Sequence, residues 1–410
     1  MPTAPGEPEP DQIMIRELEE VRDELLAGLV PTGIEVLSLA DAEGFYLAES
    51  PRSIVSLPPF DNSAMDGYAI RAADVRTVPA SLTLIGNAAA GGWFEGTVGP
   101  GQAVRIFTGA PLPPGADAVV MQEDTGPDPG DPGRVVIRDG VKPWENIRFR
   151  GEDIGANAAL RPAGSRLDAA SLALLAASGV ATVAVHRRPR VRVLVTGNEL
   201  ARIGDPLRPG QIYESNALML ASLVRSAGGV PQSPAPVPDD LPRVRAALRE
   251  AIDDSDLVLT AGGASVGEYD LVRQALVDLG GAVDDWRIAL KPGKPFIRGR
   301  LEGRPVLGVP GNPVSAFVTT VLLVLPALRR LQGAGDVLPS TTPGILGEPL
   351  SNPESRRHFI RVISAPDGRV RPSGPQASHR LASLAAANGL LDLPPRSQLM
   401  EGSPVQVIRW

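Results

Sequence analysis

Residues 256–270 read DLVLTAGGASVGEYD, an apolar run of strand length that ends in two glycines, a serine, a third glycine and two carboxylates. A short run with a β-branched valine that stops at glycine favours a buried strand over Leu257–Thr260. Gly262 and Gly263 allow backbone conformations in which N–H groups point at an anion near the start of the next helix. The stretch therefore predicts a strand leading into an anion-binding turn, with Asp270 placed to hold a divalent cation.

Two other interpretations fit the same residues. A glycine turn between a strand and a helix is often only a tight connection. Residues 263–267, GASVG, also match G-x-S-x-G, the nucleophile elbow of α/β-hydrolases, in the strand–turn–helix context that this motif needs. A hydrolase requires a histidine downstream, and His358 and His379 are available. These residues alone leave open a hydrolase with Ser265 as nucleophile.

The composition is that of a globular protein with several domains, since the 410 residues are 43% hydrophobic and 21% charged. The 44 glycines and 42 prolines indicate many short elements and sharp turns. A net charge of −7 argues against nucleic acid as the main partner. The chain has no cysteine and three scattered histidines, which excludes thiolate chemistry and disfavours a zinc site. Any bound metal is therefore expected to be oxygen-liganded, such as Mg²⁺.

Three further segments have simple readings. Residues 1–11 are acidic and proline-rich and lack the features of a signal peptide, so residues 1–10 are predicted to be a disordered tail. The apolar spacing from Asp11 to Val30 predicts an amphipathic helix. The most apolar run, Val314–Leu328, is shorter than the ~18 residues of a membrane span, which predicts a buried core helix instead.

Predicted strands alternate with helices from residue 190 to residue 330, the pattern of a doubly wound parallel sheet. Thr196–Glu199, Gly262–Asp270 and Pro310–Ser315 each follow a predicted strand. They should therefore meet at the carboxyl edge of one sheet, where ligands bind in open α/β folds. The helix after Thr196–Glu199 is predicted at Asn216–Ala227, with Ser215 or Asn216 as its N-cap. Neither dinucleotide nor P-loop fingerprints occur in the chain.

Residues 291–295, KPGKP, bring two lysines to the same region, and their prolines restrict where each ammonium group points. An oxyanion would be their natural partner, and a solvated lysine turn is the alternative.

The predicted fold class is a multidomain α/β and β protein, in which a central doubly wound α/β domain is accompanied by smaller parts. The predicted division is a disordered tail (1–10), a discontinuous helical and linker domain (11–56 and 142–187), an inserted β domain (57–141), the α/β domain (188–338) and a C-terminal β-barrel-like domain (339–410).

Seven motifs carry a family resemblance. They are LPPFDNSAMDGYA (57–69), RIFTGAPLPPGADAVVMQED (105–124), NIRFRGEDI (146–154), TGNEL (196–200), GGASVGEYD (262–270), KPGKP (291–295) and GVPGNPVSAF (308–317). In this order they closely resemble the molybdopterin molybdenumtransferases of the MoeA type and the carboxyl-terminal domain of gephyrin, over roughly residues 10–400. The resemblance implies a cytoplasmic, elongated homodimer with four domains per subunit. The implied reaction uses Mg²⁺ and converts adenylylated molybdopterin and molybdate into molybdenum cofactor and AMP.

The resemblance also implies roles for residues that match the motifs. The metal and the adenylyl phosphate would be surrounded by Glu199, Asp239 or Asp240, Ser265 and Asp270. Molybdate or the pterin phosphate would be held by Lys291, Lys294, Pro295, Arg361 and Ser378, and Thr196, Gly262, Gly263 and Pro310 to Pro313 would shape the pocket. Asp61, Thr108 and Asp153 would reach the site of the other subunit. Catalysis is expected to depend chiefly on Asp270, Ser265, Glu199, Lys291 and Lys294.

Two positions depart from the family pattern. Asn198 stands where the family usually has aspartate, which puts one metal contact in doubt, and Arg287 stands where lysine is common. Two other functions stay open on the sequence, a molybdopterin adenylyltransferase and a gephyrin-like scaffold that binds peptides. An adenylyltransferase is also a candidate partner for substrate delivery.

Overall fold

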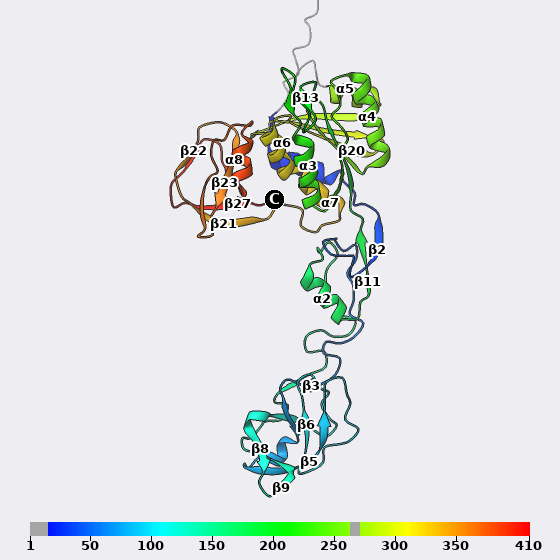
Figure 1. Cartoon of the computed structure of the whole chain (residues 1–410), viewed down its shortest axis with the longest axis vertical. Coiled ribbons are helices and arrows are strands. Elements are labelled where there is room, and N and C mark those ends of the chain that lie inside the picture. The colour runs from blue at the N-terminus through cyan, green and yellow to red at the C-terminus, as the bar shows by residue number, and fades with distance from the viewer. Residues whose placement is uncertain (1–14, 263–270) are drawn as a thin grey trace, which may run out of the picture.

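The computed structural model describes residues 15–262 and 271–410. The molecule is elongated, with a central α/β unit beside a β-barrel at one end and a separate β domain at the other, joined by a narrow stem (Figure 1). The predicted disordered tail, residues 1–10, and the turn residues Gly263–Asp270 lie outside the described residues.

The central sheet confirms the α/β prediction but is mixed rather than fully parallel. Its strands lie in the order β1 (Ile15–Arg16), β17 (Ala282–Ile288), β19 (Pro295–Leu301), β20 (Arg304–Val309), β16 (Leu257–Ala261), β12 (Arg190–Val195) and β15 (Val230–Gln232). The four strands from β20 to β15 are parallel, whereas β19 is antiparallel to both of its neighbours. The reversal arises because the chain turns back around KPGKP, so that Trp286 pairs with Phe296.

Helices cover both faces of this sheet, as a doubly wound fold requires. One apolar cluster joins the sheet to α1 (Leu18–Ala27), α3 (Asn216–Ser226), α6 (Pro313–Thr319) and α7 (Leu325–Leu331). A second cluster joins the opposite face to α4 (Leu241–Asp254) and α5 (Leu271–Asp278). The carboxyl ends of β12, β16 and β20 therefore lie at one edge of the sheet, between the two layers of helices.

The predicted core helix is confirmed as buried, although it is longer than expected. Residues Pro313–Leu331 form a continuous helical segment of 19 residues in which α6 and α7 are joined by a π-helical turn, Thr320–Val324. Its length and composition alone would allow it to cross a membrane, but 89% of its most apolar window is buried inside the protein. The segment is therefore a core helix because it packs inside the protein, and not because it has too few apolar residues to span a membrane.

The N-terminal helix begins later than its apolar spacing predicts. Residues Ile15 and Arg16 instead form β1, which pairs with Arg287 and Ile288 of β17. The Arg16 guanidinium lies 4.9 Å from the centre of the Trp286 ring. Tertiary pairing with the sheet therefore overrides the helical periodicity at these two residues.

The distal domain is built on a six-stranded sheet in the order β7-β4-β6-β5-β9-β8. Its strands are β4 (Gly67–Ile70), β5 (Ala80–Ala88), β6 (Gln102–Ile106), β7 (Ala118–Met121), β8 (Thr125–Asp128) and β9 (Asp131–Ile137), with β3 (Asn62–Ser63) pairing with β10 (Ile147–Arg148) at its base. The stem consists of β2 (Ile34–Ser38), β11 (Thr182–His186) and α2 (Ala169–Ala177).

The C-terminal part is a closed barrel. Its ring consists of β23 (Arg357–Ser364), β24 (Arg369–Pro372), β21 (Thr341–Leu346), β27 (Pro404–Ile408) and β25 (Gly389–Leu393), which pairs again with β23. A short pair, β22 (Leu350–Asn352) with β26 (Ser397–Leu399), and helix α8 (Leu381–Ala386) complete it. Strand β18 (Leu290–Lys291) leaves the central unit and pairs with β23, which ties the barrel to the α/β unit.

A buried carboxylate fixes the junction between stem and central sheet. Asp256, 6% exposed, accepts two hydrogen bonds of 2.8 Å from the Arg187 guanidinium and one of 2.7 Å from the Arg190 backbone N–H. Burial opposes ionisation, but these hydrogen bonds outweigh it and hold the pKa of Asp256 below its ordinary value. The ionised form is therefore part of the folded state.

We predict that Asp256→Asn lowers the free energy of unfolding by about 3 kcal/mol, because it leaves a partly buried guanidinium without its charge partner. The Asp256 contribution should be present above the unfolded carboxyl pKa of about 4 and should be lost as the pH falls through the lower folded pKa. Urea denaturation between pH 3 and pH 7 measures both effects. Asp278→Asn, which breaks an exposed pair with Arg245, is the control and should cost less than about 1 kcal/mol. Equal losses of unfolding free energy in the two variants would contradict the stabilising role of the ionised Asp256.

Candidate functional site

The first residues of the three strand-end loops lie together, as the sequence predicts. Strands β12, β16 and β20 are neighbours, so Thr196, Gly262 and Pro310 begin three adjacent loops. Gly262 has φ +89°, and a Cβ atom on it would lie 2.6 Å from the Thr196 carbonyl oxygen. A Cβ on Gly311 would lie 3.6 Å from the Cα of Gly262. Only glycine at position 262 allows this approach, which brings the loops to one edge.

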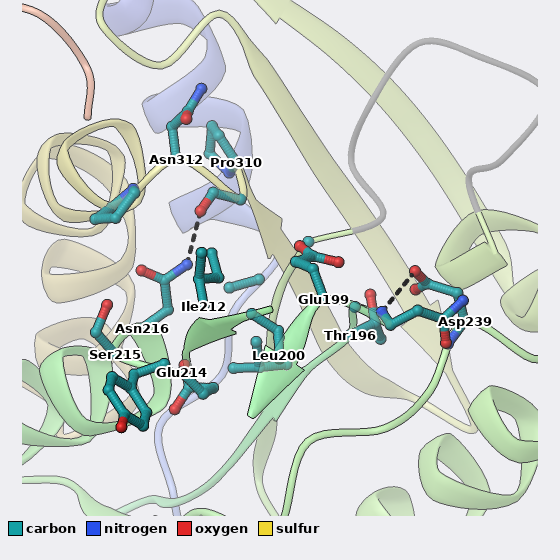
Figure 2. Close-up of a pocket in the computed structure, with 18 of the residues that line it drawn as sticks. Thr196, Glu199, Leu200, Ile212, Glu214, Ser215, Asn216, Asp239, Pro310 and Asn312 are labelled. Carbon is teal, nitrogen blue, oxygen red and sulfur yellow. Dashed lines mark hydrogen bonds between the residues drawn. The ribbon is translucent and has the colours of Figure 1, made fainter. Parts of the chain in front are cut away.

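These loops border a cavity of about 1120 Å³ between the central unit and the C-terminal barrel (Figure 2). The α/β unit supplies most of its wall, while His379 and Leu381 come from the barrel. The predicted residues that line it are Thr196, Glu199, Asp239, Gly262, Pro295, Pro310 and Pro313. Parts of the site far apart in sequence are thus brought together.

Glu199 and Asp239 are the acidic side chains of adjacent loops at this cavity (Figure 2). The Asp239 carboxylate accepts a hydrogen bond of 3.2 Å from the Asn198 N–H. Asp240, the alternative to Asp239, instead caps α4 by accepting a bond of 3.1 Å from the Arg243 N–H. Of these two aspartates, Asp239 is therefore the one available to a ligand.

The donor set suits a hard cation. The carboxylates of Glu199, Glu214 and Asp239 and the residue Thr196 line the cavity. Thr196 is 7% exposed, and its Oγ1 has no hydrogen-bond partner among the described residues. Magnesium is commonly held by one or two carboxylates together with water and substrate phosphates. In residues 15–262 and 271–410, no three His, Cys, Asp or Glu side chains form a complete metal cluster. Asp270 and Ser265 lie outside the described residues.

The start of α3 contributes residues that the sequence analysis did not assign to the site. Asn216 is 8% exposed and donates a hydrogen bond of 2.7 Å to the Gly311 carbonyl, which joins α3 to the third loop. Glu214 accepts a bond of 2.8 Å from the Ala217 N–H. Ser215 is the N-cap residue, as the sequence predicts, but its side chain forms no cap bond, and Glu214 satisfies the first turn instead. In the sequence, the polar run Glu214–Asn216 after a short strand was the feature that could have indicated these site residues.

The KPGKP segment reaches the site through Pro295. Pro295 lines the cavity, but Lys291 and Lys294 are not among the described residues of its wall. The Lys291 ammonium forms a salt bridge with Glu354 of the barrel, and this hydrogen bond lowers the pKa of the Glu354 carboxyl. Lys291 therefore fastens the two units together next to the cavity.

Arg361 is a fully buried cation on β23. Its Nη2 donates a hydrogen bond of 2.7 Å to the Pro375 carbonyl, whereas its Nε and Nη1 find no partner within the described part of the chain. Burial lowers the pKa of the guanidinium. The loop that receives its bond continues to Ser378, whose carbonyl accepts from the Val314 N–H at 3.2 Å. A buried cation without a charge partner among the described residues is suited to an oxyanion.

The two histidines that a hydrolase could use, His358 and His379, lie in different surroundings. His379 lies on the cavity wall. His358 lies on β23, and burial together with the charge of Lys291 lowers its pKa to about 4, so it is neutral at pH 7. The structure therefore leaves His379 as the histidine at the cavity.

Asp61 directly precedes β3, Thr108 follows β6, and the Asp153 N–H donates to the Leu57 carbonyl. Strands β3 and β6 belong to the distal end of the molecule, whereas α3 and α6, which border the cavity, lie at the other end (Figure 1). Asp61 accepts a hydrogen bond of 2.7 Å from the Arg150 N–H, and Thr108 donates to Asp66 through both its N–H and its hydroxyl. Within one chain they do not join the other site residues.

Three family models match successive parts of the chain. Residues 16–179 match the MoeA N-terminal region (domain I and II), residues 192–330 a probable molybdopterin binding domain, and residues 343–410 the MoeA C-terminal region (domain IV).

Named relatives are similar over most of the chain. Molybdopterin molybdenumtransferase 2 of Mycobacterium tuberculosis is 40% identical over 390 residues, which cover 93% of this chain and 95% of the relative. Molybdopterin molybdenumtransferase of Bacillus subtilis is 34% identical, with 91% and 89% covered. The crystal structure of the molybdopterin biosynthesis moeA protein from Pyrococcus horikoshii OT3 aligns with a TM-score of 0.84 at 30% identity, covering 97% of this chain and all of that one.

We predict that Arg361→Met leaves the unliganded protein equally stable or stabilises it by up to about 2 kcal/mol, because it removes a buried cation that lacks a charge partner. Arg357→Met on the same strand is the matched control. Arg357 binds Glu19 and Asp392, so its loss should destabilise the protein by about 3 kcal/mol. Urea denaturation in buffer free of oxyanions measures both. A loss of more than about 1 kcal/mol in Arg361→Met would contradict the view that this cation awaits an anion.

Proposed function

The chain belongs to the MoeA family and is a molybdopterin molybdenumtransferase of molybdenum cofactor biosynthesis, and on this premise we propose that its cavity binds adenylylated molybdopterin and couples AMP release to molybdate. The observation that carries the proposal is the convergence of three strand-end loops on one cavity. Its volume of about 1120 Å³ suits a substrate in which a pterin and a nucleotide are joined.

The adenylyl phosphate is proposed to lie against the loops that follow β12 and β16. Thr196 and Gly262 offer a hydroxyl and an open backbone there, and Ser265 and Gly263 continue the same turn in the sequence. Breaking a phosphoanhydride requires donors aimed at the charge that develops on the leaving phosphate. The glycines of this turn, Gly262, Gly263 and Gly267, would let backbone N–H groups act as such donors.

The carboxylates of Glu199 and Asp239 are proposed to hold Mg²⁺, with Asp270 as a third ligand. Bound there, the ion would neutralise charge on the phosphates of the anhydride. The protein's own part is to present these carboxylates beside the phosphate-binding turn, and the Asn198 N–H orients one of them.

Molybdate is proposed to bind where the barrel meets the α/β unit. It is a tetrahedral dianion, and Arg361 offers Nε and Nη1 donors that are unpaired within the described residues. Ser378, Lys294 and Pro295 would complete this subsite, and Lys291 would join it by exchanging Glu354 for the anion. The protein has no cysteine, so the sulfurs that receive molybdenum belong to the substrate.

A homodimer is proposed to complete the site, because Asp61 and Thr108 adjoin β3 and β6, which lie at the end of the molecule away from the cavity of their own chain (Figure 1), and Asp153 follows β10, which pairs with β3. The partner subunit would bring these polar groups to the cavity mouth. We also propose a cytoplasmic location and substrate delivery by a molybdopterin adenylyltransferase. The five-part domain division deduced from the sequence is proposed with one change, because residues 15–27 pack on the central α/β unit. A scaffold role could coexist with this activity.

We expect AMP release from adenylylated molybdopterin to require both molybdate and Mg²⁺. Glu199→Gln should lower this rate roughly 100-fold, because the substitution removes a cation ligand while keeping the size of the side chain. The measurement is AMP formation over time, with urea denaturation to establish that the variant is folded.

The control is Glu348→Gln, which removes an exposed carboxylate of the barrel and should leave the rate unchanged. AMP release without molybdate would indicate a phosphoanhydride hydrolase and overturn the coupling. An unchanged rate in Glu199→Gln would remove this carboxylate from the cation site.

A further inference from the structure

The loops after β12 and before α4 are joined by a reciprocal pair of hydrogen bonds. The Asn198 backbone N–H donates to the Asp239 carboxylate at 3.2 Å, and the Asp239 backbone N–H donates to the Asn198 side-chain oxygen at 3.1 Å. Each residue therefore uses its backbone to hold the side chain of the other. We call this pair the Asn198–Asp239 latch.

The latch extends a backbone ladder beyond the end of β12. The Val237 N–H donates to the Val195 carbonyl at 2.8 Å, and the Gly197 N–H donates to the Val237 carbonyl at 3.2 Å. Thr196 and Val237 form a parallel bridge between these bonds. The ladder ends at Val237, so the Asp239 backbone beyond it is held by the Asn198 side chain, which brings the exposed Asp239 carboxylate within reach of the Asn198 N–H.

From this geometry we propose that Asn198 is a positioning residue, which sets the Asp239 carboxylate in place for a divalent cation. The inference rests on the proposed cation site. Orientation by a neighbouring hydrogen-bond donor is how outer groups tune metal ligands, and losing such a group commonly costs 10–100-fold in metal affinity.

Two features of the surroundings point to a ligand rather than to loop packing alone. Thr196 lines the same cavity and is 7% exposed, and its buried hydroxyl has no hydrogen-bond partner in the described ranges. Asp240, next in the chain, is already committed to capping α4. Of the two neighbouring aspartates, Asp239 and Asp240, it is therefore Asp239 that lies at the cavity.

The side chain at position 198 must accept a hydrogen bond, and an amide does so without adding charge. An aspartate there would keep the acceptor and place a second negative charge next to Asp239, which would strengthen the attraction for a cation. An alanine would remove the acceptor. The two substitutions therefore separate the positioning role of Asn198 from its charge.

The test uses electron paramagnetic resonance to measure Mn²⁺ binding to the full chain in the absence of substrate. We expect the wild-type protein to bind Mn²⁺, Asn198→Ala to bind at least 10-fold more weakly, and Asn198→Asp to bind at least as tightly as wild type. Asp239→Asn should lose most of the affinity. Asn87→Ala, an exposed position on β5 of the distal domain, should match wild type.

The outcomes distinguish this inference from the proposed site. If wild type and Asp239→Asn differ but Asn198→Ala binds like wild type, the latch has no positioning role. If Asn198→Asp is as weak as Asn198→Ala, Asn198 acts through its amide group or through loop structure, and the inference is wrong. If wild type binds no Mn²⁺, both the cation site and the inference fail, while molybdate-dependent AMP release still tests the function.

Discussion

The approach of Gly262 to the Thr196 carbonyl is the constraint on which the site depends. A Cβ at this position would meet the carbonyl oxygen at 2.6 Å, so any other residue would push the ends of β12 and β16 apart. The third loop packs on the same glycine through Gly311, and Asn216 ties that loop to α3. The cavity, its carboxylates and its helix starts are arranged around this single contact. The parallel strands end at one edge of the sheet, and the glycine allows the loops that follow them to lie close together there.

The second determinant is that the site is shared between two units. Strand β18 leaves the central sheet and pairs with β23 of the barrel, and Lys291 reinforces that pairing through Glu354. The barrel then contributes His379 to the cavity and the buried Arg361 behind it. An uncompensated buried guanidinium costs stability in the empty protein. Its persistence at this junction is explained if an oxyanion is the charge partner, which agrees with a molybdenumtransferase.

The sequence predicted the convergence of three loops because strands, turns and helices alternate regularly from residue 190 to residue 330. It did not predict the antiparallel β19, since the local pattern says nothing of a chain reversal around KPGKP. Nor did it indicate the partner of Lys291, because Glu354 lies 63 positions away. Glu214 and Asn216 were missed since a polar run before a helix is ordinary capping chemistry. The assigned roles of Ser265 and Asp270 stay predictions, because they lie outside the described residues.

The most direct test of the central account is a crystal soaked with AMP, Mn²⁺ and tungstate, a heavier analogue of molybdate, with anomalous scattering used to locate both metals. We expect manganese between the carboxylates of Glu199 and Asp239, next to the AMP phosphate, and tungsten beside Arg361 at the junction with the barrel. Manganese and tungsten found together at some other surface, with the cavity occupied by neither, would contradict the account.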